Sequence, residues 1–106
     1  MQGLQRYAEA IAAYDRALAL APNNALVLNN RGAALNEIKL HEEALASFER
    51  AVAVAPDYAE AYYNRGNALK GLKRIAEALE SYERALDIGT PLPHAFSGFA
   101  ECAAKI

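Results

Sequence analysis

The chain has 106 residues, of which 54% are hydrophobic, and its formal net charge is only −2. The basic residues are dispersed among acidic ones, so the sequence offers no basic patch for nucleic acid or an anionic membrane. No apolar run approaches the roughly 20 residues that a membrane-spanning helix requires. We expect no secretion signal in Met1-Gln2-Gly3, and one cysteine excludes an internal disulfide. These features favour a small cytoplasmic helical protein.

Apolar residues at three- and four-residue spacing predict six helices. In chain order they span residues 4–20, 24–37, 41–54, 58–71, 75–88 and 92–105. Pro22-Asn23-Asn24 is expected to end the first helix and cap the second, and Asp57 with Glu60 to form a capping box at the fourth. Gly89-Thr90-Pro91 is expected to separate the last two helices.

The sequence also repeats itself with a period of 34 residues. Pro22 and Pro56 are separated by this interval, and so are Gly32 and Gly66. Repeats of this length indicate stacked helical units, which act through an extended surface and not through a catalytic pocket. We divide the single array into two central repeats with a partial repeat on either side: 1–22, 23–56, 57–90 and 91–106.

Small and apolar residues recur within each period in an order that resembles the tetratricopeptide repeat (TPR) family. The first copy contains Leu28, Arg31, Gly32, Leu35, Ala44, Phe48, Ala51 and Pro56, and the next contains Tyr62, Arg65, Gly66, Leu69, Ala78, Tyr82 and Ala85. The resemblance implies an all-α solenoid, in which pairs of antiparallel helices, A and B, form a right-handed superhelix. Gly32 and Gly66 on the A helices are expected to face Ala44 and Ala78 on the B helices, where larger side chains would hold the helices apart.

The A helices are expected to line the concave surface of this array. Asparagine recurs there, and Asn30 and Asn64 occupy the same place in two consecutive repeats. A side-chain amide both donates and accepts, so it can pair with the backbone of an extended peptide without reading its side chains. We therefore predict a peptide-binding groove in which the amides of Asn30 and Asn64 have no structural partners. The predicted groove residues are Asn29, Asn30, Tyr63, Asn64, Asn67 and Lys70.

Two resemblances bear on the kind of ligand. The recurring asparagines are similar to those of TPR arrays on O-GlcNAc transferases, and residues 93–103 resemble the segment before the catalytic region of bacterial SPINDLY-like glycosyltransferases. This alternative implies a substrate-targeting arm whose catalytic domain lies outside these residues. By contrast, the clamp of chaperone-binding TPR domains for a C-terminal carboxylate is disfavoured. That clamp needs basic and amide side chains at two positions of one repeat and at two positions of a later repeat. In this sequence the first two positions hold Asn29 and Ala33, and the other two hold Glu60 and Asn64, or His94 and Gly98.

The sequence shows no catalytic or metal-binding constellation, and we predict neither an enzyme nor a cofactor. His94 and Cys102 are eight residues apart on one predicted helix. The helical rise between them is about 12 Å, which is too long for a base to act on a nucleophile. His41 has no second metal ligand at a suitable spacing. We expect His41 to pack at the start of its helix, Cys102 to be a packed thiol, and Arg31 and Arg65 to pair with neighbouring acids.

The two partial repeats are expected to expose complementary apolar faces. Residues 1–22 supply a B helix without its A helix, and residues 91–106 supply an A helix without its B helix. We therefore expect either a fragment of a longer protein or head-to-tail self-association, with a symmetric dimer as the rival. The faces concerned are Ala10, Ile11, Tyr14 and Ala17 at one end, and Phe96, Phe99, Ala100 and Ala103 at the other.

Overall fold

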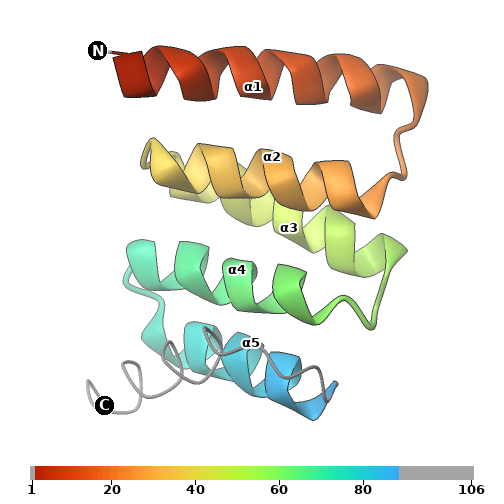
Figure 1. The fold of residues 1–106 in the computed structure, drawn as a ribbon. Helices are drawn as coiled ribbons and strands as arrows, with labels where there is room; N and C mark the ends of the chain where they lie inside the picture. The colour runs from red at the N-terminus through yellow and green to blue at the C-terminus, as the bar shows by residue number, and fades with distance from the viewer. Residues whose placement is uncertain (1, 89–106) are drawn as a thin grey trace.

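The computed structural model describes residues 2–88, which form five α-helices and no strand (Figure 1). Five of the six predicted helices are confirmed, with boundaries within two residues of those expected. The sixth, at 92–105, lies outside the described residues. The helices are α1 (Gln2–Leu20), α2 (Ala25–Glu37), α3 (His41–Val54), α4 (Ala59–Gly71) and α5 (Ile75–Asp87).

The helices stack in chain order. Helix α2 packs against α3, α4 packs against α5, and α3 contacts α4 across the boundary between the two pairs. Helices α2 and α4 also touch each other, whereas α1 contacts only α2 among the described helices. Figure 1 shows this order as a ladder from α1 at the top to α5 at the bottom. The A helices of the sequence analysis are thus α2 and α4.

The start of α2 is capped as predicted, but the start of α4 is not. The Asn24 Oδ1 atom accepts a hydrogen bond from the Val27 backbone N–H at 3.2 Å, which satisfies a donor in the first turn. At α4 the N-cap is Tyr58, whose side chain makes no capping bond, so the capping box predicted for Asp57 and Glu60 is wrong. Glu60 instead accepts a hydrogen bond from Asn29 of α2.

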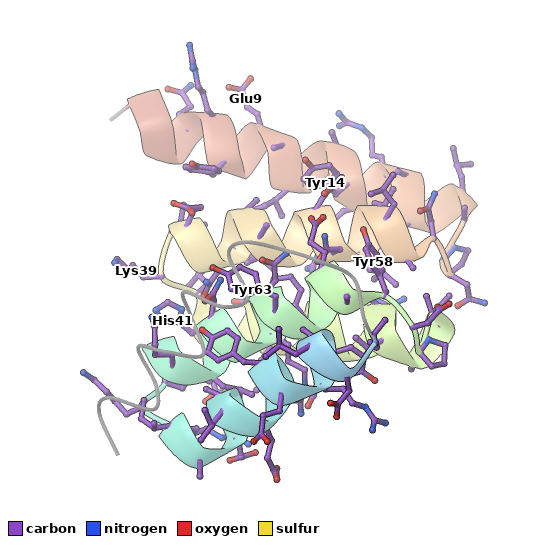
Figure 2. The ribbon with its side chains drawn as sticks, turned by 60° about the horizontal axis from the view of Figure 1, so that its bottom comes forward. Glu9, Tyr14, Lys39, His41, Tyr58 and Tyr63 are labelled. Atoms are coloured by element: carbon purple, nitrogen blue, oxygen red, sulfur yellow. The ribbon has the colours of Figure 1, made fainter. Side chains whose placement is uncertain are left out.

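The turns after α2 and α4 share one geometry, which was not predicted from the sequence. Lys39 and Lys73 adopt left-handed backbone conformations, with φ of 70° and 66°. The backbone N–H of the next residue donates to a carbonyl five residues back, Leu40 to Leu35 and Arg74 to Leu69, both at 2.9 Å. This is the Schellman motif, which usually has glycine at the left-handed position. Figure 2 shows Lys39 and His41 beside each other at the first of these turns.

Each helix pair is held together by an aromatic ring against a glycine. Phe48 and Tyr82 are fully buried, and a Cβ atom added to Gly32 or Gly66 would lie 2.5 or 2.6 Å from the Cε1 atom of the respective ring. The close approach predicted at these glycines is therefore present, but their nearest neighbours are these rings and not Ala44 or Ala78. The two alanines are themselves fully buried.

Ion pairs join neighbouring repeats at equivalent positions. Arg31 Nε lies 2.6 Å from Asp15 Oδ1, and Arg65 Nη2 lies 3.2 Å from Glu49 Oε2. Both pairs confirm the expectation that these arginines bind carboxylates. Since the acidic partners are more than half exposed, each pair contributes at most about 1 kcal/mol to stability.

Candidate functional site

The contact between α2 and α4 places the predicted binding residues on neighbouring helices. We call their shared solvent-accessible surface the A-helix face. Its members are exposed or half-buried, in contrast to the apolar residues that the same helices turn toward α3 and α5. They are Leu26, Asn30, Ala33 and Glu37 of α2, with Glu60, Tyr63, Asn64, Asn67 and Lys70 of α4.

Asn29 does not belong to this surface, although it was predicted to line the groove. Its side chain is only 1% exposed. The Nδ2 group donates to Glu60 Oε2 at 3.1 Å and to the Tyr58 hydroxyl at 3.4 Å, and Oδ1 accepts from Asn64 Nδ2 at 3.0 Å. A buried amide requires such partners, since an unmet polar group in the interior is costly. Asn29 therefore joins α2 to α4 and is not offered to a ligand.

Asn64 is half-buried on the A-helix face, but its amide has a partner. The prediction that this amide is free was wrong, because the buried Asn29 carbonyl lies on the adjacent helix and accepts from it. The bond fixes which end of the Asn64 amide points inward. Among the described residues, Asn64 Oδ1 makes no hydrogen bond, so this oxygen is the group that remains available as an acceptor.

Asn30 lies beside a different neighbour, helix α1. It borders an open hollow of about 230 Å³ between α1 and α2, together with Tyr7, Tyr14 and Glu37. Within the described part of the chain, the side chains of Asn30, Tyr14 and Glu37 make no hydrogen bond or ion pair. Asn30 thus matches the predicted free amide, at a place formed partly by α1.

Asn67 and Tyr63 contribute to packing as well as to the face. The Tyr82 hydroxyl of α5 donates to Asn67 Oδ1 at 2.5 Å. The Tyr63 ring lies 5.5 Å from the Tyr82 ring, centroid to centroid, at a tilt of 43°. Both residues therefore hold α4 against α5 while keeping part of their surface exposed. Lys70 is half-buried farther along the same helix.

Tyr58 belongs to the polar cluster that Asn29 forms with Glu60 and Asn64, and it was not predicted from the sequence. Burial, followed by the negative charge of Glu60, raises the pKa of the Tyr58 hydroxyl, while the hydrogen bond with Asn29 acts in the opposite direction. The residue one repeat earlier is Asn24, so the 34-residue period gave no signal at this position. Figure 2 labels Tyr58, at the N-cap of α4, and Tyr63, farther along the same helix.

The described residues hold no candidate metal centre, because residues 2–88 contain no group of three or more His, Cys, Asp or Glu side chains suited to a metal ion. His41 packs as expected: its Nδ1 atom contacts Asn36 Oδ1, and a Cβ on Gly71 would lie 2.6 Å from its ring. His94 and Cys102 lie outside the described residues. Of the five helices, none has the length and apolar character to cross a membrane.

The repeated helix pairs with a glycine against an aromatic ring define a tetratricopeptide repeat solenoid, and the chain belongs to that family. A family model described as tetratricopeptide repeat matches residues 23–90, and one described as TPR repeat matches residues 4–38. No curated protein matches the sequence.

Solved TPR domains share the fold across nearly all of the chain. The first TPR of Spaghetti (RPAP3) bound to the HSP90 peptide SRMEEVD is 29% identical, with a TM-score of 0.90 over 95% of this chain and 80% of that one. The Sgt2 TPR domain from Aspergillus fumigatus is 30% identical, with a TM-score of 0.91 over 95% and 68%. MamA from Desulfovibrio magneticus RS-1 is 29% identical, with a TM-score of 0.86 over 96% and 58%.

Proposed function

We propose that this chain is a protein-interaction module that holds an extended peptide along the A-helix face. The observation that carries the proposal is the pair of amides at Asn30 and Asn64, one repeat apart on two helices that touch. The Oδ1 atom of Asn64 is directed by its bond to Asn29 and is suited to accept a backbone N–H of the ligand. The peptide-bound RPAP3 domain, similar in fold, supports a peptide ligand.

The charges on the A-helix face favour a neutral or basic ligand over an acidic one. Glu37 and Glu60 are exposed carboxylates, and Lys70 is the only basic residue among the described members of the face. The peptide SRMEEVD in the RPAP3 complex contains two glutamates and one aspartate. An acidic peptide of that type would meet like charge at Glu60, which disfavours binding.

The proposal is tested by selecting binders from a displayed library of random peptides and measuring their affinity by fluorescence anisotropy. We expect the selected peptides to lack net negative charge. Asn30→Ala and Asn64→Ala should each weaken binding by about 0.5 to 1.5 kcal/mol, because each removes a hydrogen-bonding amide. A labelled SRMEEVD peptide serves as the acidic comparison.

Asn23→Ala is the matched control, since Asn23 is an exposed asparagine in the turn before α2 and outside the A-helix face. It should leave peptide affinity unchanged. Selected peptides that bind wild type, Asn30→Ala and Asn64→Ala equally well would show that the A-helix face is not the binding surface. Preferential binding of SRMEEVD would contradict the proposed charge preference.

A further inference from the structure

The contact between α2 and α4 contains a polar site whose geometry is fixed by one buried side chain, Asn29. This residue is only 1% exposed, and both N–H donors of its amide are used. One donates to Glu60 Oε2 at 3.1 Å and the other to the Tyr58 hydroxyl at 3.4 Å. The Asn29 Oδ1 atom accepts from Asn64 Nδ2 at 3.0 Å. The two side chains on the A-helix face, Glu60 and Asn64, are therefore both held from beneath by Asn29.

The negative charge of Glu60 determines which way the two amides face. An ionised carboxylate accepts hydrogen bonds and has none to donate, so Asn29 must turn its Nδ2 group toward Glu60. Asn29 Oδ1 then points toward Asn64, which must direct its own Nδ2 group inward. The Oδ1 atom of Asn64 is left on the outer side. One charged residue thus sets the direction of two amides in succession.

The two atoms that this arrangement leaves for a ligand are both acceptors. Within residues 2–88, Glu60 Oε1 and Asn64 Oδ1 make no hydrogen bond, and Glu60 forms no ion pair. Glu60 is exposed and Asn64 half-buried. They are four residues apart on α4, so they are neighbours on one face of the helix, with Cβ atoms about 5 to 6 Å apart. The site offers one negative charge and one neutral oxygen to a group that donates hydrogen bonds.

We propose that Glu60 and Asn64 together bind the guanidinium group of an arginine side chain in the ligand. A guanidinium is always charged and carries five N–H donors in a planar fork, so it can donate to two neighbouring acceptors at once. The ammonium of lysine is a compact and more strongly hydrated charge, which fits such a pair less well. This inference rests on the proposed function and deepens it by naming a side chain of the peptide. Asn64 Oδ1 has two lone pairs, so one remains for a peptide N–H.

Leu26 adds apolar surface on the neighbouring helix. It is 58% exposed and lies one helical turn before Asn29 on α2. Leu26 and Glu60 occupy the same position in consecutive repeats, on two helices that touch. An arginine side chain has an apolar stem that packs on such surface while its charged head stays in water. The pair of residues therefore suits the two parts of one arginine.

The site is tested directly with arginine blocked at both ends, N-acetyl-L-arginine amide, titrated into ¹⁵N-labelled protein and followed by NMR. The side-chain amide signals of Asn29 and Asn64 should shift together and reach saturation. The citrulline analogue has nearly the same shape without the charge and should cause no saturable shift, and the lysine analogue should bind more weakly. Glu60→Gln keeps an acceptor for Asn29 and removes the charge, so it should weaken arginine binding about five-fold or more.

Glu37→Gln is the matched control, because it removes an exposed carboxylate of the A-helix face that has no hydrogen bond to a buried amide in the described part of the chain. It should leave arginine binding unchanged. Equal losses from Glu37→Gln and Glu60→Gln would show that arginine responds only to the general negative charge of the face. Absence of a saturable shift at Asn29 and Asn64, or an equal response to citrulline, would overturn the proposed site. Urea unfolding establishes that both variants remain folded.

The displayed peptide library separates this inference from the proposed function. Peptides selected on wild type should be enriched in arginine, and peptides selected on Glu60→Gln should lose that enrichment. Exchanging the arginine of a selected peptide for citrulline should weaken its binding to wild type about five-fold and its binding to Glu60→Gln much less. Selected peptides that depend on Asn30 but carry no arginine would refute the arginine site alone. Saturable binding of blocked arginine, with peptides that ignore Asn30→Ala, would support the arginine site and count against the proposed function.

Discussion

Asn29 is buried and polar, and its side chain depends on three neighbours in α4 and at its N-cap. Its amide donates to Tyr58 and Glu60 and accepts from Asn64. Asn30, the next residue, faces the hollow beside α1 and has no hydrogen bond among the described residues. Two adjacent asparagines on one helix thus have different roles: the first links α2 with α4, and the second is available for binding.

Substitution separates these two roles. Asn29→Ala should destabilise the protein by about 1 to 3 kcal/mol, because it leaves the Asn64 amide and the Glu60 carboxylate without their interhelical partner. Asn30→Ala should change stability by less than about 0.5 kcal/mol, as for other surface positions. Urea unfolding followed by circular dichroism measures both values. Equal losses from the two variants would contradict the structural role assigned to Asn29.

At the scale of helices and turns, apolar spacing and the 34-residue period were sufficient to predict five helices and the cap at Asn24. The capping box failed because Glu60 binds Asn29, which is 31 residues earlier in the chain. The free amide at Asn64 failed for the same reason, since its partner lies on another helix. Local patterns describe what a residue does within its own helix, whereas a polar partner across helices depends on how the helices pack.

The turns after α2 and α4 allow an element-scale prediction. Lys39 and Lys73 stand at left-handed positions where a side chain costs about 1 to 2 kcal/mol and glycine does not. Lys39→Gly and Lys73→Gly should therefore each raise the free energy of unfolding by about 0.5 to 1 kcal/mol, after the greater freedom of glycine in the unfolded chain is counted.

Lys39→Ala and Lys73→Ala are the controls for this prediction, because they remove the charge and retain the Cβ atom at positive φ. They should give no such gain in urea unfolding experiments. If the alanine variants are stabilised as much as the glycine variants, the benefit comes from loss of charge and not from relief of backbone strain.

At the scale of the whole molecule, the helices differ in how many neighbouring helices pack against them. Helix α3 packs against both α2 and α4, whereas α1 packs against α2 alone among the described helices. In a repeat protein each unit is stabilised chiefly by its immediate neighbours, so a helix with one neighbour opens at a lower free energy than a helix with two. The exposed aromatic and alanine side chains of α1 are part of the same asymmetry.

Hydrogen exchange measures this difference helix by helix. In dilute solution, the backbone amides of α1 should exchange faster than those of α3, because α1 opens without disturbing the α2–α3 pair. Protection of α1 equal to that of α3 in dilute solution would contradict the one-sided support seen in the structure.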